Sequence, residues 1–238
     1  RKDYTRILIT DKKGKVIHQI RQTGFGGFFE SFHPFRSGMC WSPDGKQLAF
    51  VTLNKGRDEI RIVNVVKKKL VKKIRLPLGS ISSPDWSNNG KEIVFSAITD
   101  GVSDLFIYNL DSDSLIRLTE SLQYEADPHF SPDGQKILFS IEDTCGTATH
   151  PNSPYGSTPS ELAILDLPTG NISIITNTKW NEKQPCFSPD GKSIVYVSDR
   201  NGLDNLYICS IDSTEKSRPL TDFVGGCSNP DWALDSSC

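Results

Sequence analysis

The most constraining feature of the sequence is a six-residue turn motif that recurs at a nearly constant spacing. The copies are WSPDGK at 41–46, WSNNGK at 86–91, FSPDGQ at 130–135 and FSPDGK at 187–192, and a degenerate copy, WALDSS, begins at Trp232. Their leading aromatic residues are 45, 44, 57 and 45 residues apart. A repeat of this length predicts a solenoid, a propeller or an array of small units.

The residues after each motif predict strands. A run rich in β-branched and aromatic residues comes first: QLAFVT, EIVFSA, KILFSI and SIVYVS. A glycine-containing turn, a second such run and a final run ending near a leucine follow in most copies. With the segment before the motif, each repeat holds four short strands and no convincing helix. The predicted fold is therefore all-β, a propeller with four-stranded antiparallel blades.

The motif itself has the composition of a tight turn. Proline presets φ for a type I turn, aspartate accepts local backbone hydrogen bonds, and glycine adopts the left-handed conformation. The residues assigned to this structural role are Pro43, Asp44, Gly45, Asn89, Gly90, Pro132, Asp133, Gly134, Pro189, Asp190 and Gly191. We therefore interpret the aspartates of the motif as scaffold and not as functional groups.

These repeats resemble those of TolB-type propellers. The resemblance rests on a proline two residues before the aromatic (Pro84, Pro128, Pro185, Pro230), the SPDGK turn, SDRNG at 198–202, and LT at 118–119 and 220–221. It implies a non-enzymatic protein of the cell envelope with an extracytoplasmic, periplasmic location. Similar repeats also form accessory propellers beside peptidase domains and occur in long envelope proteins, which residues 29–51 resemble most.

The repeat boundaries predict a single propeller domain over 1–238. The expected units are a partial blade at 1–37, complete blades at 38–80, 81–124, 125–181 and 182–225, and a partial blade at 226–238. Because TolB-type rings usually have six blades, we interpret the chain as a fragment of a six-bladed ring. A five-bladed ring, closed by joining the two ends, is the alternative.

Polar residues before the aromatic of each repeat are the candidate ligand site. Strand alternation is expected to place positions one and three before the aromatic on one face, near a central channel. The first column holds Cys40, Asp85, His129, Cys186 and Asp231, and the second holds Gly38, Ser83, Asp127, Gln184 and Asn229. These side chains could hold a polar ligand or a metal, but a channel lining is commonly polar simply because it holds water, and we favour a solvated channel.

No catalytic motif is present in the sequence. The four histidines lack HExxH spacing, no GxSxG elbow occurs, and GFGG at 24–27 has no βαβ context. The six cysteines have no CxxC spacing and are interpreted as buried or unpaired thiols. We therefore predict no catalytic residues, no metal and no cofactor within the chain.

Charge does not define a partner. The net charge is −2, and no segment has the length and hydropathy of a membrane span. The basic run KKKLVKK at 67–73 lacks interleaved aromatic residues, so we interpret it as protection of an outer strand and not as a nucleic-acid surface. Two irregular segments remain: residues 145–160, interpreted as an inserted surface loop, and 23–38, whose five phenylalanines are expected to enter the core.

The sequence thus predicts a protein–protein interaction scaffold of the cell envelope. One alternative is an accessory propeller that gates substrate access to a peptidase domain outside the chain. A second is a propeller that binds a small ligand or a metal through Asp85, Asp127, His129, Gln184, Asn229 and Asp231.

Overall fold

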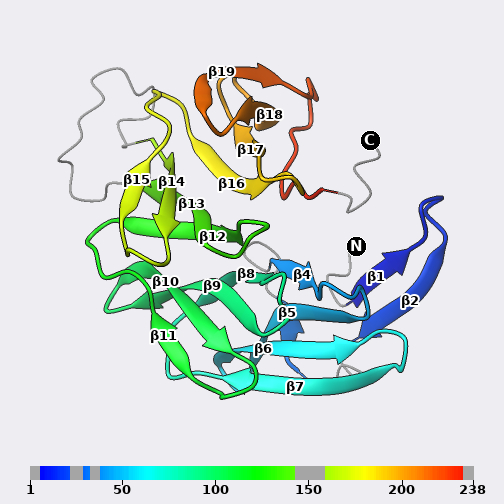
Figure 1. The fold of residues 1–238 in the computed structure, drawn as a ribbon. Helices are drawn as coiled ribbons and strands as arrows, with labels where there is room; N and C mark the ends of the chain where they lie inside the picture. The colour runs from blue at the N-terminus through cyan, green and yellow to red at the C-terminus, as the bar shows by residue number, and fades with distance from the viewer. Residues whose placement is uncertain (1–5, 22–28, 33–37, 143–158, 233–238) are drawn as a thin grey trace.

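The computed structural model describes residues 6–21, 29–32, 38–142 and 159–232. Within these residues all regular structure is β-strand. Four larger antiparallel sheets follow one another along an arc, and the strands β4, β8, β12 and β16 lie on its inner side (Figure 1). This is the radial arrangement of propeller blades, as the repeats predict.

The strands follow the repeats. A two-stranded ribbon comes first, β1 (Arg6–Thr10) with β2 (Val16–Arg21). The first of the four sheets that follow contains β3 (Ser31–Phe32), β4 (Met39–Trp41), β5 (Gln47–Asn54), β6 (Arg57–Asn64) and β7 (Lys69–Arg75). The second contains β8 (Ile81–Trp86), β9 (Glu92–Thr99), β10 (Val102–Asn109) and β11 (Leu115–Arg117), and the third contains β12 (Tyr124–Phe130), β13 (Lys136–Glu142), β14 (Glu161–Asp166) and β15 (Ile172–Ile174). The fourth contains β16 (Glu182–Phe187), β17 (Ser193–Ser198), β18 (Asn205–Ser210) and β19 (Ser213–Pro219).

The repeated turn joins the first and second strands of each complete sheet. In the third sheet, Gly134 adopts φ +70° and its N–H donates to Ser131 O at 2.8 Å. Asp133 Oδ1 accepts hydrogen bonds from the Ser131 hydroxyl at 2.6 Å and from Gln135 N at 3.0 Å. Asn89 accepts the equivalent bonds in the second sheet. The turn therefore needs a short polar acceptor followed by glycine, which both sequence variants supply.

The core lies between neighbouring sheets. The two middle strands of the second sheet are buried on both faces, as the near-continuous burial of β9 and β10 shows, whereas the burial of β18 in the last sheet alternates. Apolar side chains of β5 and β6 pack against β8 and β9, those of β9 and β10 against β13, and those of β13 and β14 against β17 and β18. The stacking of sheets, and not of helices on sheets, therefore stabilises the fold.

The first four-stranded unit departs from the expected pattern. Two short strands, β3 and β4, pair with the same strand, β5. Phe29 and Phe32 are 0% and 7% exposed, and their rings pack against each other with centroids 4.6 Å apart. The core interpretation of the phenylalanine-rich segment holds for these two residues, whereas Phe25, Phe28 and Phe35 lie outside the described residues.

The two ends of the described chain differ in structure. Residues 6–21 form a paired ribbon, but residues 227–232 pair with no strand in the part of the chain that the structure describes. Residues 233–238 and most of the inserted segment, 143–158, lie outside the described residues. Among the described residues, no helix has the length and hydropathy to cross a membrane.

Candidate functional site

The innermost strands do not alternate strictly. Strands β8, β12 and β16 each contain a bulge, at 82–85, 126–129 and 183–186. At each bulge a non-glycine residue adopts positive φ: Ser83 at 48°, Asp127 at 53° and Gln184 at 50°. Asn229, at the equivalent position, has φ 53°. The bulge adds one residue to the strand, so a simple period-2 pattern does not describe which way these side chains point.

The second column forms contacts from sheet to sheet. The Ser83 hydroxyl donates to Asp127 Oδ1 at 2.6 Å, and Gln184 Oε1 accepts from Asn229 N at 2.7 Å. At the first position of the column there is no side chain, because a Cβ on Gly38 would lie 2.7 Å from Ser83 Cα. The column therefore connects neighbouring innermost strands and does not simply line a space.

The first column makes a second set of contacts between sheets. Asp85 Oδ2 accepts a hydrogen bond at 2.8 Å from Phe130 N in the next sheet. His129 Nδ1 accepts one at 3.4 Å from Phe187 N. In each case a polar side chain binds the backbone of the aromatic residue that begins the neighbouring turn motif. The candidate ligand residues are thus used to hold consecutive sheets in register.

Several members of the first column interact electrostatically. Burial raises the pKa of Asp85, the nearby His129 opposes this shift, and Asp231 adds to it. Burial also raises the pKa of the Cys40 thiol well above its ordinary value, and Asp85 and Asp231 raise it further. Cys40 and Asp231 belong to the first and last described inner segments, and they interact electrostatically.

The chemistry available to these groups is limited. Burial raises the pKa of Cys186 as well, so both thiols favour the protonated form, which is a poor nucleophile and a poor metal ligand. Burial raises the pKa of Asp127 against hydrogen bonds from Ser83 and the Gln184 backbone. Across the described ranges, no group of three or more His, Cys, Asp and Glu side chains is arranged to hold a metal ion.

Not all predicted site residues join this arrangement. Asp231 is exposed, and among the described residues its Oδ1 accepts only a local bond from Trp232 N at 2.8 Å. Asn229 is also exposed and contacts Gln184 through its backbone N–H and not through its side chain. The described cysteines, Cys40, Cys186, Cys209 and Cys227, are free thiols, and Cys145 and Cys238 lie outside the described residues.

The direction of the strands defines two faces of the molecule. The contacts between β8, β12 and β16 join equivalent positions, so these strands run in the same direction. We call the face where they begin the upper face; it carries the loops 76–80, 118–123, 175–181 and 220–226 and the hairpins 55–56, 100–101 and 199–204. The lower face carries the repeated turns at 42–46, 87–91, 131–135 and 188–192.

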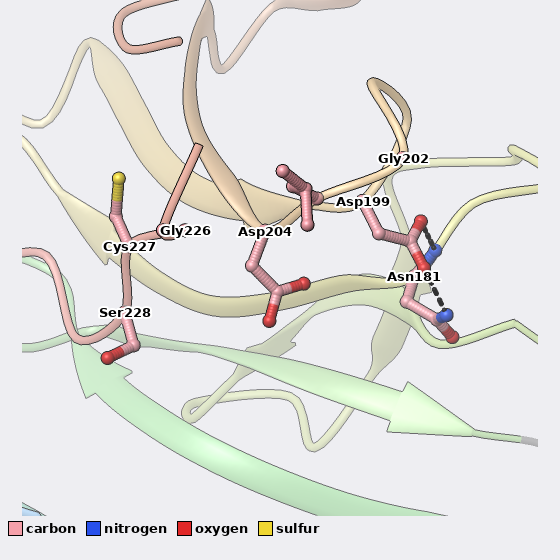
Figure 2. A pocket seen from close by; sticks show the side chains of 9 residues that line it. Asn181, Asp199, Gly202, Asp204, Gly226, Cys227 and Ser228 are labelled. Carbon is pink, nitrogen blue, oxygen red and sulfur yellow. Dashed lines mark hydrogen bonds between the residues drawn. The ribbon is translucent and has the colours of Figure 1, made fainter. Parts of the chain in front are cut away.

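A hollow on the upper face was not foreseen from the sequence. Its volume is about 580 Å³, and it lies between the hairpin 199–204 and the loop that follows β19, where Cys227 and Ser228 contribute to its wall (Figure 2). Asp199 fixes one side by accepting bonds from Asn181 N at 3.0 Å and Asn181 Nδ2 at 2.6 Å. Lys183 Nζ lies 2.9 Å from Asp204 Oδ2. In the sequence, the SDRNG segment at 198–202 was the signal that could have pointed to this hollow.

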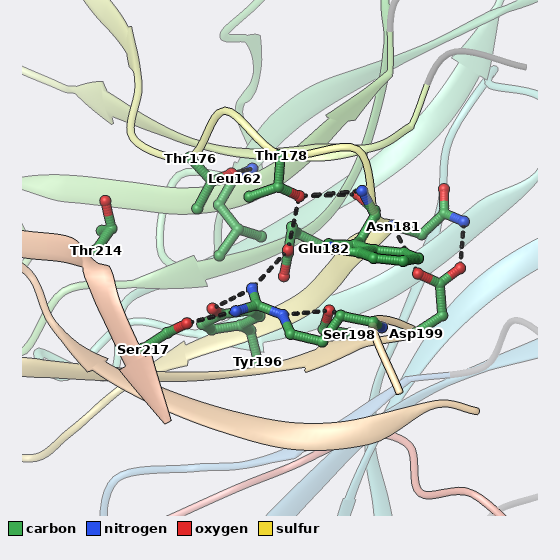
Figure 3. A network of polar contacts seen from close by, with 12 residues as sticks. Leu162, Thr176, Thr178, Asn181, Glu182, Tyr196, Ser198, Asp199, Thr214 and Ser217 are labelled. Carbon is green, nitrogen blue, oxygen red and sulfur yellow. Dashed lines mark hydrogen bonds and ion pairs between the residues drawn. The ribbon is translucent and has the colours of Figure 1, made fainter. Parts of the chain in front are cut away.

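A buried polar network supports this part of the upper face (Figure 3). Glu182 is fully buried, and its Oε1 accepts bonds from Arg200 Nη2 at 2.7 Å and Thr178 Oγ1 at 2.9 Å. Arg200 also lies 4.4 Å above the ring of Tyr207. Burial raises the pKa of Glu182, and the charge of Arg200 opposes the shift. Because it joins two strands and two loops, this network is a structural element.

The repeats, the sheet order and the radial core define a β-propeller. Residues 31–148 match the model of the TolB beta propeller domain family. The chain is 32% identical over 110 residues to the uncharacterized peptidase YuxL of Bacillus subtilis, covering 46% of this chain and 16% of that protein. It is 29% identical over 110 residues to the Tol-Pal system protein TolB of Hydrogenovibrio crunogenus, covering 46% of this chain and 22% of that protein.

The fold comparison covers more of the chain. The crystal structure of TolB from Acinetobacter baumannii aligns with a TM-score of 0.66 over 92% of this chain and 50% of that chain, at 19% identity. The chain thus has the fold of the TolB-type β-propellers, and residues 31–148 resemble their repeats in sequence. It spans about a fifth or less of the length of the two curated relatives, and half of the solved TolB chain.

Proposed function

We propose that this propeller is a non-enzymatic scaffold that binds proteins in the cell envelope, outside the cytoplasm. The observation that carries the proposal is the use of the axial polar residues. Asp85, His129 and Gln184 each accept a hydrogen bond from the backbone of the next blade unit. Groups that could perform chemistry therefore stabilise the ring, and the loops remain as the surface available to partners.

The upper face has the side chains that a protein partner requires. Its loops expose apolar side chains at Leu122 (69% exposed), Phe223 (59%) and Val224 (91%), and Leu203 in the hairpin 199–204 is also exposed. Apolar side chains gathered on the loops of a rigid scaffold are typical of protein contact sites. The similarity to a Tol-Pal system protein supports an envelope location.

Site-specific photocrosslinking tests the proposal. A benzophenone amino acid replaces Val224 on the upper face or, as a matched control, Val66, which is 67% exposed in the turn between β6 and β7 on the lower face. In cells of the source organism, we expect adducts with envelope proteins from position 224 and none from position 66. The absence of adducts at 224, or the same adducts at both positions, contradicts the proposal.

A second candidate function follows from the peptidase relative. The similarity to a protein named as a peptidase supports an accessory propeller that restricts access to a catalytic domain. Under this alternative, the natural full-length gene product hydrolyses peptide substrates, and insertion of a bulky loop at the hairpin 100–101 changes the size limit of those substrates. A full-length product without peptidase activity excludes the alternative and leaves the scaffold proposal standing.

The ligand or metal alternative has its own test. If Asp127 and His129 hold a metal, elemental analysis of the purified protein gives a stoichiometric metal that disappears in Asp127→Ala. The hydrogen bonds of Asp127 with Ser83 and of His129 with Phe187 favour the scaffold, because they already occupy these groups.

A further inference from the structure

Positive charge is concentrated in one blade unit. Residues 55–75 contain nine Lys and Arg and two Asp and Glu, a net charge of +7, whereas the whole chain has a net charge of −2. On the outer strand β7, the exposed positions alternate, so Lys69, Lys73 and Arg75 lie on the same outward face. The rest of the chain is therefore acidic, and this unit forms a single basic region on the perimeter.

The basic region ends at a hollow on the upper face. This hollow, of about 500 Å³, lies between the hairpin β5–β6 and the loop after β7. Lys55, Arg57 and Arg75 contribute cationic side chains to it, and Leu76 and Pro77 contribute apolar surface. The combination of apolar surface with charged groups at the margin is typical of sites that bind a peptide side chain and its carboxylate.

Among the acidic residues of the hollow, Glu59 forms an ion pair with Arg75, but neither Glu59 nor Asp58 forms a described ion pair with Lys55 or Arg57. Asp58 is 8% exposed, and its Oδ2 accepts a hydrogen bond at 2.9 Å from Ile81 N. Glu59 is 1% exposed and is held by Asn54, by Arg61 and by Arg75 Nε at 2.7 Å. Within the part of the chain that the structure describes, neither Lys55 nor Arg57 takes part in an ion pair.

The hairpin that carries Lys55 and Arg57 is fixed in place. Glu30 Oε1 accepts a bond from Lys55 N at 2.9 Å, and Glu30 Oε2 accepts one from Gly56 N at 3.4 Å. Both oxygens of this carboxylate therefore bind the backbone of the hairpin tip. A rigid hairpin loses less conformational entropy when a ligand binds to its side chains.

We infer that this hollow binds an acidic peptide segment of a partner protein, with Lys55 and Arg57 contacting its carboxylates. The inference rests on the proposed scaffold function and specifies one binding site on the upper face and the chemistry of its partner. The net charge of +7 over 55–75 raises the local concentration of such a segment and increases its association rate.

The observations favour a peptide over other polyanions. A single-stranded nucleic acid requires aromatic platforms for its bases, and no aromatic residue lines the hollow within the described chain. An anionic membrane binds to a surface with inserted aromatic or long apolar side chains, but here the apolar residues, Leu76 and Pro77, lie within a concave site.

Fluorescence anisotropy with a defined probe tests the inference. The probe is a rhodamine-labelled decapeptide of alternating Glu and Leu, and a Gln and Leu peptide is its neutral counterpart. We expect saturable binding of the Glu peptide, weakened by added salt, and at least tenfold weaker binding of the Gln peptide. Lys55→Glu with Arg57→Glu is expected to weaken binding of the Glu peptide at least tenfold.

The matched control is Lys67→Glu with Lys68→Glu on the lower face, which changes the net charge by the same amount. Lys55 and Lys68 both occupy turns with positive φ, 54° and 50°, so the two double variants impose similar demands on the backbone. The control is expected to change the affinity less than twofold. A milder pair, Lys55→Gln with Arg57→Gln, and circular dichroism of all variants separate lost binding from lost folding.

Three results would overturn the inference. They are no binding of the Glu peptide, equal losses in the upper and lower double variants, and tighter binding of an oligonucleotide or of anionic lipid vesicles than of the peptide. The photocrosslinking at Val224 does not depend on Lys55 or Arg57, so failure here leaves the scaffold proposal to be judged by that experiment.

Discussion

At Gly38 the backbone approaches the next innermost strand too closely for any side chain. An added Cβ would lie 2.7 Å from the Cα atom of Ser83, and this backbone atom cannot move aside by a side-chain rotation. We expect Gly38→Ala to lower the free energy of unfolding by about 1–3 kcal/mol, because the two strands must separate. Urea denaturation measures this change.

Gly225→Ala is the matched control, because a Cβ at position 225 meets nothing within 4 Å. We expect this variant to change the free energy of unfolding by less than about 0.5 kcal/mol. If the two alanine variants are equally stable, the close approach between Gly38 and Ser83 does not exist in solution.

The turn aspartates predict a dependence of stability on pH. The Ser131 hydroxyl, followed by Gln135 N–H, lowers the pKa of Asp133 below 3.8, so the folded state binds its proton less tightly than the unfolded state does. The stability from Asp133 is therefore fully present near neutral pH and is lost as the pH falls through the folded pKa. The free energy of unfolding of the wild type should therefore exceed that of Asp133→Asn near neutral pH, and this difference should disappear only in that acidic range.

Urea denaturation of both proteins at a series of pH values measures this difference. Ser131→Ala removes the main cause of the lowered pKa and should shrink the dependence on pH. A constant difference between the wild type and Asp133→Asn from neutral to acidic pH would contradict the assignment.

At the level of elements, the bonds from one sheet to the next decide how the blades are joined. Asp85 Oδ2 connects β8 to Phe130 N of β12 across 2.8 Å. We expect Asp85→Ala to lower the free energy of unfolding by about 1–3 kcal/mol, because the backbone N–H of Phe130 loses its acceptor. Asp85→Asn should be less destabilising, since its amide oxygen can still accept the bond without a buried charge.

Thermal and urea denaturation give these stabilities, and Asp231→Ala is the control from the same column. Asp231 is exposed and binds only the backbone of Trp232, so its removal is expected to cost less than about 0.5 kcal/mol. Equal losses in Asp85→Ala and Asp231→Ala would show that the bond to Phe130 does not stabilise the ring.

Strands and turns could be predicted from the sequence because each repeats a local signal. Runs such as EIVFSA became β9, and the glycines of the motif adopt positive φ. The bulges could not be predicted, because Ser83 and Gln184 are not residues that favour positive φ, and only tertiary contacts hold them there. Both hollows were also missed, since loops distant in sequence form their walls.

For the whole molecule, the distribution of burial predicts the order of local opening. Strands β9 and β10 are buried on both faces, whereas β1 and β2 expose Leu8 (45%), Val16 (42%) and Ile17 (55%). Native-state hydrogen exchange should therefore be fastest in the ribbon and slowest in β9 and β10. Equal protection in both would mean that the ribbon opens only together with the sheets.

The bulge on the innermost strands has a consequence for how this fold can diversify. Ser83, Asp127, Gln184 and Asn229 share one backbone conformation although their side chains differ in length and charge. The backbone at this position is thus largely independent of the side chain that it carries. Residues around the axis can be exchanged one at a time, for a ligand or a new partner, while the sheets that support them keep the same architecture.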